Sequence, residues 1–393
     1  MTGETSGAGA GSKPAGFVPP VYPFDNLTEL AEAASRHPGG MVDLSIGTPC
    51  DPPPAKVVEA LGSSGAERGY PPAAGSPELR EAAAAWIERR FGLRVDPARE
   101  LAACIGTKEF VAGTPHFLRL RWPERDTVLH PALAYPTYEM GARLAGCRAV
   151  AVPLRADGTM DLAAVSPEDA ERALCVWVNS PGNPAGQLED LGEVAKWGRA
   201  HGVAVLSDEC YVEFTWGDGR GRSILEHGLE GVVALHSLSK RSNLAGVRAG
   251  VYAGDPELVA YLAAVRRHAG FMVPGPVQHA AAVAFDDDES VAAQRREYAD
   301  RLGYLASTLT SAGIPVEPPL GGFYLWVPAP DALRTGSGSP SPGYALARLL
   351  AESAGVLSSP GEAYGPAGAC HTRLAVVQPL DRLRLVAERL GVG

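Results

Sequence analysis

Residues 232–248, VVALHSLSKRSNLAGVR, place polar and basic side chains directly after a short apolar segment. The segment Val232–His236 is apolar, partly β-branched and too short for a typical helix, so we predict that it is a strand. Ser237, Lys240 and Arg248 follow it. Ligands of open α/β sheets bind outside the carboxyl ends of the strands. These three side chains are therefore predicted to belong to a binding site.

Two further segments repeat this arrangement upstream. Ala173–Val178 is a predicted strand that leads into NSPGNP at residues 179–184, and Val203–Ser207 is a predicted strand that leads into DECY at 208–211. Stretches with helical periodicity separate these segments, which indicates an α/β protein with a mostly parallel sheet. All three predicted carboxyl ends carry chemically active side chains, so we expect them to share one ligand.

The length of 393 residues exceeds the size at which one core keeps growing, so a large and a smaller domain are expected. Residues 276–312 are mostly free of helix breakers and predict a long helix or helix pair at the domain junction. We expect a tail at 1–16, a large domain at 49–290, and a small domain made of 17–48 and 291–393. In the small domain, 321–327 and 373–377 are predicted strands and 334–343 a surface loop.

Local signals predict three helix starts. Ser76-Pro77 and Asp255-Pro256 each place a capping side chain before proline and an apolar stripe. Gly106-Thr107-Lys108 precedes the apolar-rich segment Phe110–Leu120 and is predicted to open a helix. The N–H groups at a helix start are unpaired and attract anions, so this last start is a candidate phosphate site.

Composition excludes several classes of function. The hydrophobic fraction is 46% and the net charge is −10, with no basic run that would suit nucleic acid. No stretch approaches the ~18 uninterrupted apolar residues of a membrane helix, and residues 1–16 lack the apolar core of a secretion signal. Six cysteines are scattered singly, which argues against a metal site or a disulfide framework and favours the reducing cytoplasm. Small molecules are the expected partners.

Pyridoxal 5'-phosphate (PLP) accounts for the three strand ends together. This cofactor needs a lysine amine for its aldehyde, an acid beside its pyridine nitrogen, donors to its ring oxygen and several groups on its phosphate. Lys240 is predicted to hold the aldehyde as a Schiff base and to move the substrate proton as general base and acid. Asp208 would keep the pyridine nitrogen protonated. Tyr211 and Asn183 would donate to the ring oxygen.

The phosphate and the ring face have candidates of their own. Arg248 presents a planar fork suited to phosphate, beside Ser237 and the backbone N–H groups of Gly106, Thr107 and Lys108. Tyr135 is predicted to stack on the cofactor ring.

These motifs resemble fold-type I, class I aminotransferases. The match rests on NPAG at 183–186, DECY at 208–211, SLSKRSNLAGVR at 237–248 and Arg373, in that order along the chain. The resemblance implies a large domain with a mostly parallel seven-stranded sheet, a smaller α/β domain and a homodimer with shared active sites. It also implies that Gly47, Asn183 and Arg373 bind the substrate, with Gly47 and Arg373 on its α-carboxylate. Tyr70 would reach the phosphate of the partner subunit.

Within that family, the sequence is most similar to N-succinyldiaminopimelate aminotransferases of lysine biosynthesis. The similarity lies in LSIGTP at 44–49, GTKE at 106–109, AYPTY at 134–138, HSLSKRSN at 236–243 and MVPGPVQ at 272–278. Such an enzyme transfers an amino group between glutamate and an N-succinylated amino-ketopimelate. Ala185 replaces the usual threonine of the NPTG string, so the substrate is less well defined than the cofactor.

A second acidic group on the substrate would need its own cation. Four basic residues flank the predicted site, and we hypothesise that one of them binds the distal carboxylate. They are Lys108, Arg241, Arg266 and Arg267.

The candidate residues also have ordinary structural interpretations. A lysine after a strand is ordinarily a solvated surface residue, Asp208-Glu209 could cap a helix, and Arg373 could be an ordinary strand residue. Tyr211, Tyr135 and Tyr70 could all be packing aromatics. The same cofactor frame also supports decarboxylation, replacement or carbon–carbon bond chemistry, because fold does not fix function. A PLP-sensing module without turnover is a third possibility, although the full set of catalytic side chains argues against it.

Overall fold

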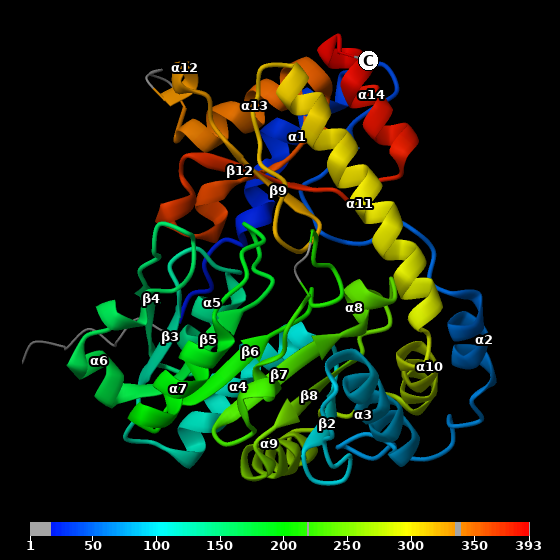
Figure 1. Cartoon of the computed structure of the whole chain (residues 1–393), viewed down its shortest axis with the longest axis vertical. Coiled ribbons are helices and arrows are strands. Elements are labelled where there is room, and N and C mark those ends of the chain that lie inside the picture. The colour runs from blue at the N-terminus through cyan, green and yellow to red at the C-terminus, as the bar shows by residue number, and fades with distance from the viewer. Residues whose placement is uncertain (1–16, 218–219, 335–338, 393) are drawn as a thin grey trace, which may run out of the picture.

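A seven-stranded sheet forms the centre of the larger part of the molecule (Figure 1). The computed structural model describes residues 17–217, 220–334 and 339–392, and the predicted tail at 1–16 lies outside them. The strand order is β2-β8-β7-β6-β5-β3-β4, and β8 alone runs antiparallel to its neighbours. The predicted mostly parallel sheet is therefore confirmed. Its strands are β2 (Leu101–Cys104), β3 (Thr127–Pro131), β4 (Arg148–Val152), β5 (Ala173–Asn179), β6 (Ala204–Asp208), β7 (Val232–Ser237) and β8 (Gly250–Gly254).

The three predicted strands are β5, β6 and β7. Every residue of these strands is buried, which explains their continuous apolar runs. Each predicted strand continues to one polar residue at its carboxyl end, and these residues are Asn179, Asp208 and Ser237. Asn179 pairs directly with Asp208 across β5 and β6. The three chemically active ends therefore lie along one edge of the sheet.

Alternating side chains of the strands build two separate cores. On β5, Val176 and Val178 join one apolar cluster, while Cys175 and Trp177 join another. Successive strand residues point to opposite faces, so helices cover both faces of the sheet. The helices of this part are α2 (Ala55–Ser63), α3 (Pro77–Phe91), α4 (Thr107–Arg121), α5 (Thr137–Leu144), α6 (Pro167–Arg172), α7 (Leu191–His201), α8 (Leu238–Arg241), α9 (Pro256–His268) and α10 (Gly275–Phe285).

The predicted helix starts are confirmed. The Ser76 side chain accepts a 3.2 Å hydrogen bond from Leu79 N at the start of α3. The Asp255 carboxylate accepts bonds from the N–H groups of Glu257 and Leu258 at the start of α9. Helix α4 begins at Thr107, directly after Gly106.

The long helical stretch is a pair, α10 and α11 (Asp288–Ser311). Asp287 ends the continuity because its carboxylate accepts a 3.1 Å bond from Ser290 N and caps α11. Helix α11 runs from the end of α10 to a second, smaller group of strands (Figure 1).

The smaller group of strands has an apolar core that includes residues from both ends of the described chain, such as Val42 and Leu374. It contains a three-stranded sheet, β11-β12-β9, and a parallel pair, β1-β10. The domain limits given above stay a prediction. The remaining elements are η1 (Pro23–Leu27), α1 (Thr28–Ser35), β1 (Val42–Asp43), η2 (Leu162–Ala164), η3 (Ile224–His227), β9 (Tyr324–Pro328), α12 (Asp331–Arg334), α13 (Pro342–Ala354), β10 (Val356–Leu357), β11 (Ser359–Pro360), η4 (Gly361–Tyr364), η5 (Pro366–Gly368), β12 (His371–Ala375) and α14 (Leu380–Leu390).

The predicted loop at 334–343 is too long. Helix α13 already begins at Pro342, because Ser341 accepts a 3.0 Å bond from Tyr344 N and proline suits the first helical position. Residues 335–338 of that loop lie outside the described part of the chain.

Among the helices of the described residues, none has the length and apolar character needed to cross a membrane.

Candidate active site

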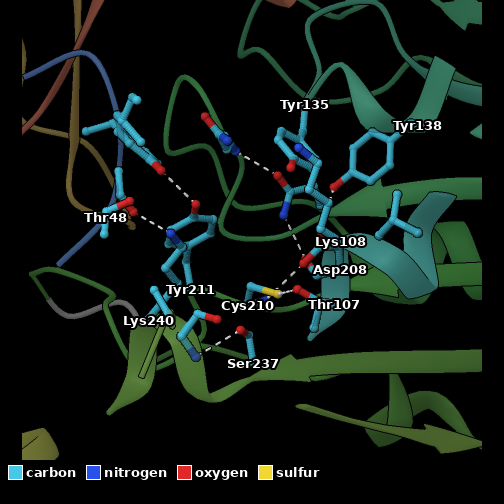
Figure 2. A pocket seen from close by; sticks show the side chains of 18 of the residues that line it. Thr48, Thr107, Lys108, Tyr135, Tyr138, Asp208, Cys210, Tyr211, Ser237 and Lys240 are labelled. Atoms are coloured by element: carbon cyan, nitrogen blue, oxygen red, sulfur yellow. Dashed lines mark hydrogen bonds between the residues drawn. The ribbon is translucent and has the colours of Figure 1, made fainter. Parts of the chain in front are cut away.

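A cavity of about 480 Å³ lies at the carboxyl edge of β5, β6 and β7, within the ~300–1,000 Å³ typical of small-molecule sites. The large sheet and the smaller strand group both contribute to its walls. Figure 2 shows Lys240 and Ser237 on one side of this cavity and Tyr135 and Tyr138 on another. The predicted site residues that line it are Gly47, Thr107, Lys108, Tyr135, Asn183, Asp208, Tyr211, Ser237, Lys240, Arg248 and Arg373.

Lys240 presents its amine to the cavity from the four-residue helix α8, which directly follows β7. The amine donates a hydrogen bond to the carbonyl oxygen of Gly47. Burial lowers the pKa of Lys240 to about 8, and the positive charges of Arg373 and Arg248 act in the same direction. A lysine with this pKa is partly neutral near physiological pH, as a nucleophile and proton acceptor requires.

Asp208 is a buried carboxylate held from two sides. The Tyr138 hydroxyl donates a 2.9 Å bond to Oδ2, and Cys210 N donates a 3.2 Å bond to Oδ1. Burial raises the pKa of Asp208, while both hydrogen bonds favour its ionised form. A buried carboxylate of this kind is suited to pair with a protonated ring nitrogen.

Arg373 connects the smaller sheet to the end of β5. Its guanidinium donates a 2.8 Å bond to Asn183 Oδ1 and a 2.5 Å bond to the carbonyl oxygen of Ser45. The bond through Oδ1 leaves the Asn183 amide nitrogen as the donor on that side chain. Arg373 itself lies on β12 and is almost fully buried. Its fixed position at the cavity wall suits recognition of a carboxylate.

The part of the cavity at the start of α4 suits a phosphate. Thr107 and Lys108 occupy the first two positions of α4, where backbone N–H groups have no partner within the helix. Arg248 approaches the same place, and a Cβ added to Gly106 would collide with its guanidinium. Gly106 was predicted to donate its N–H to the phosphate, but this group donates a 2.8 Å bond to the carbonyl oxygen of Cys104. Gly106 instead leaves room for Arg248.

The side chains around the cavity are therefore chemically suited to hold PLP. A partly neutral lysine, a buried carboxylate and an anion-binding helix start with an arginine are arranged around one cavity, at Lys240, Asp208 and Arg248. These are three of the features that the cofactor needs for its aldehyde, ring nitrogen and phosphate.

Two of the four basic residues considered for a distal carboxylate point elsewhere. Arg241 is 3% exposed, donates to Glu213 at 3.1 Å and forms a 2.7 Å ion pair with Asp288. Arg266 is 1% exposed and paired with Glu109. The structure contradicts the hypothesis for both residues, because each is buried, already paired with an acid and outside the lining of the cavity.

Lys108 and Arg267 complete the four. Arg267 is exposed in the last turn of α9 and does not line the cavity. Lys108 does line it, so it is the candidate that the structure retains.

Tyr70 lies outside the cavity and is 96% exposed in the single chain. Its role at a partner's phosphate stays a prediction.

Several residues that line the cavity were not predicted from the sequence as site residues. Tyr138 is three residues after Tyr135 and therefore on the same side of the start of α5, a spacing that could have revealed it. Tyr324 follows Gly322-Phe323 on the smaller sheet and gave no local signal of proximity to Tyr211. The other wall residues in this group are Tyr22, Ile46, Thr48, Val111, Asn179, Cys210, Ser239 and Ala245.

The chain matches one known protein family over most of its length. Residues 39–390 match the family model described as aminotransferase class I and II. The chain is 41% identical over 379 residues to 4-dedimethylamino-4-oxo-anhydrotetracycline transaminase OxyQ of Streptomyces rimosus, covering 94% of this chain and 99% of that protein. It is 32% identical over 384 residues to LL-diaminopimelate aminotransferase of Aquifex aeolicus, covering 95% and 96% of the two chains.

Solved structures show the same similarity. A probable N-succinyldiaminopimelate aminotransferase from Thermus thermophilus superposes with a TM-score of 0.80 at 33% identity, covering 93% of this chain and 98% of the other. Substrate-bound BacF from Bacillus subtilis gives a TM-score of 0.85 at 26% identity, covering 94% of each chain.

Proposed function

Because the chain belongs to the aminotransferase class I and II family and is a PLP-dependent aminotransferase, we propose that glutamate is its amino donor and a keto acid with a second acidic group its acceptor. The observation that carries this proposal is the position of Lys108. Four cations line the described part of the cavity: Lys108, Lys240, Arg248 and Arg373. Three of them serve the cofactor aldehyde, its phosphate and the substrate α-carboxylate, which leaves Lys108 for a distal carboxylate.

The surroundings of Lys108 support this assignment. Its ammonium donates a 3.1 Å bond to the Tyr22 hydroxyl and lies 4.6 Å from the centroid of that ring. Within residues 17–217, 220–334 and 339–392, no carboxylate forms an ion pair with Lys108. An uncompensated positive charge at the wall of a cavity attracts an anionic substrate group.

The side chains divide the chemistry among them. Bound PLP supplies an electron sink for the electrons left when the substrate loses its α-proton. The Nζ atom of Lys240 accepts this proton and then donates it to the adjacent carbon of the cofactor, as its pKa of about 8 allows. Arg373 and Gly47 orient the substrate through its α-carboxylate. Asp208 keeps a positive charge on the ring nitrogen, and Tyr211 with Asn183 donates to the ring oxygen.

Single-turnover spectroscopy tests the donor. Glutamate added to the purified holoenzyme should change the cofactor absorption and release one equivalent of 2-oxoglutarate, whereas no response to any common amino donor would contradict transamination. The Lys108→Gln variant should raise the KM for glutamate about tenfold or more and leave the reaction with alanine nearly unchanged, because alanine has no distal charge. Arg267→Gln is the matched control and should change neither reaction. Equal losses with both donors would contradict the role of Lys108.

An acceptor panel tests the second half-reaction. N-succinyl-2-amino-6-ketopimelate is the first compound, because it carries distal acidic groups and because solved relatives include a probable N-succinyldiaminopimelate aminotransferase. The 41% identity to OxyQ favours a second compound, the polycyclic ketone in that enzyme's name. Mass spectrometry of the products identifies the acceptor. Amination of the polycyclic ketone alone would replace the diacid as the proposed substrate.

We also propose a homodimer in the cytoplasm, in which Tyr70 completes the partner's phosphate site. The exposure of Tyr70 in the single chain supports this arrangement. Mixing the inactive variants Lys240→Ala and Tyr70→Ala should restore activity, because a mixed dimer contains one site with both native residues. If the mixture stays inactive while mixed dimers form, Tyr70 does not act across the interface.

A further inference from the structure

Two buried tyrosines meet at the cavity from different sheets. Tyr211 follows β6 of the large sheet, and Tyr324 is the first residue of β9 in the smaller sheet. Their hydroxyl oxygens are 2.7 Å apart, and the side chains are 6% and 2% exposed. This distance is that of a well-formed hydrogen bond between hydroxyl groups.

The Tyr324 ring is fixed on both sides. The Arg373 guanidinium lies over one face, with its carbon 4.2 Å from the ring centroid. Gly47 touches the other end of the side chain, since an added Cβ would collide with the Tyr324 hydroxyl and lie 2.8 Å from two of its ring carbons. The hydroxyl therefore has little freedom to leave Tyr211.

The positions of the two hydroxyl protons determine whether Tyr211 can donate a hydrogen bond into the cavity. Each phenol has one proton, so Tyr211 can donate into the cavity only if Tyr324 is the donor in their mutual bond. Burial raises the pKa of both hydroxyls, and the charge of Arg373 lowers both. The Arg373 guanidinium covers the Tyr324 ring at 4.2 Å, and a cation in this position makes the Tyr324 hydroxyl the better donor in the mutual bond.

We propose that Tyr324 is a positioning residue that turns the Tyr211 proton toward the cofactor ring oxygen and strengthens Tyr211 as a donor. A hydroxyl that accepts one hydrogen bond donates a stronger one, because hydrogen bonds in a chain polarise each other. This inference rests on the proposed role of Tyr211 as a donor to the ring oxygen. It gives the smaller sheet a direct effect on the cofactor in addition to its contact with the substrate.

The Tyr324→Phe variant tests the inference by spectroscopy of the resting holoenzyme. A weaker Tyr211 donor leaves more negative charge on the ring oxygen and so raises the proton affinity of the neighbouring Lys240 nitrogen. The midpoint of the pH titration of the cofactor's visible absorption should rise by about 0.5–1 pH unit, the equivalent of one neutral hydrogen bond. An unchanged midpoint would overturn the proposal.

A double-mutant cycle shows whether Tyr324 acts through Tyr211. In a Tyr211→Phe background, the additional Tyr324→Phe change should no longer move the midpoint, and a persisting shift would overturn the proposal. Tyr364→Phe is the matched control, because Tyr364 also contacts the Arg373 guanidinium, with its ring centroid 4.9 Å from the guanidinium carbon. A shift in this control as large as in Tyr324→Phe would assign the effect to Arg373 alone.

Replacement of Tyr324 by 3-fluorotyrosine keeps the hydroxyl and makes it more acidic. The midpoint should then fall, in the direction opposite to Tyr324→Phe, and a rise would contradict the proposal. If Tyr211→Phe itself leaves the midpoint unchanged, the proposed function of Tyr211 fails. A shift in Tyr211→Phe without one in Tyr324→Phe overturns the present inference alone.

Discussion

The Tyr138 hydroxyl donates a 2.9 Å hydrogen bond to Oδ2 of Asp208, and both side chains are buried. This bond favours the charged form of a carboxylate whose pKa burial raises. A residue of helix α5 therefore stabilises the ionised form of Asp208, the acid that we propose beside the cofactor ring nitrogen.

We expect Tyr138→Phe to weaken cofactor binding. Loss of a hydrogen bond to a charged group costs about 1.5–3 kcal/mol, so the dissociation constant for PLP should rise roughly tenfold to a hundredfold. Titration of the apoenzyme with PLP, followed by fluorescence, measures this constant. Tyr135→Phe is the control, because it keeps the ring that is proposed to stack on the cofactor and should bind almost as wild type does. Unchanged binding in Tyr138→Phe would show that Asp208 needs no such support.

The sequence alone predicted Asp208 as a site residue but did not predict Tyr138 as one. Asp208 and Lys240 were predictable because they lie at or soon after the carboxyl end of a short buried strand, and parallel strands bring these ends to one edge. Arg248 was predictable from its place in the segment that follows Lys240. Tyr138 and Tyr324 reach the cavity from helix α5 and from the smaller sheet. The position of Tyr324 depends on tertiary packing that no local pattern encodes, whereas the three-residue spacing from Tyr135 was the one local signal for Tyr138.

Arg241 was a predicted candidate for the site, but it does not line the cavity. It directly follows Lys240 and was one of four candidates for binding the distal carboxylate, yet consecutive residues of a helix point about 100° apart. Its guanidinium consequently packs over the Trp86 ring, 5.5 Å from the centroid, and pairs with Glu213 and Asp288.

We expect Arg241→Gln to destabilise the fold without selectively affecting acidic substrates. Loss of a hydrogen bond to a charged group costs about 1.5–3 kcal/mol, while Glu213 keeps its pair with Arg90 and the exposed Asp288 keeps its pair with Arg89. Urea unfolding of the apoenzyme measures the loss in the free energy of unfolding. Arg94→Gln breaks the exposed pair of Arg94 with Glu88 and should leave that free energy unchanged within error. A selective rise in the KM for glutamate in Arg241→Gln would restore Arg241 as a substrate residue.

The lowered pKa of Lys240 predicts how the apoenzyme takes up PLP as pH changes. The neutral amine is the form that attacks the cofactor aldehyde, and its fraction rises with pH through the folded-state pKa of about 8. The uptake rate should therefore increase up to roughly pH 8 and then level off. Stopped-flow absorbance at a series of pH values measures this rate. An increase that continues toward pH 10 would show an ordinary lysine.

The same shift predicts a pH dependence of stability in the apoenzyme. The folded state gives up the Lys240 proton at about pH 8, whereas the unfolded state keeps it up to the ordinary value of 10.5. Since the unfolded state binds more protons between these values, the contribution of Lys240 to stability increases with pH across this window. Lys240→Met lacks the titrating group, so its stability advantage over wild type should shrink from pH 8 to pH 10.5. An advantage that stays constant over this window would contradict the lowered pKa.

Gly47 has no room for a side chain, and this predicts a loss of function in Gly47→Ala. The added Cβ would collide with the Tyr324 hydroxyl, while the carbonyl oxygen of Gly47 accepts the hydrogen bond from Lys240. Either Tyr324 or the segment that carries Gly47 must move, and a displacement near 1 Å can reduce activity about a hundredfold. The measurement is kcat/KM with glutamate. Gly62→Ala is the control: Gly62 lies in α2 with open space around the position of a Cβ, so this variant should keep full activity and gain slight stability from the better helix former. Full activity in Gly47→Ala would mean that Tyr324 can yield without consequence, and its contact with Tyr211 would then have no part in catalysis.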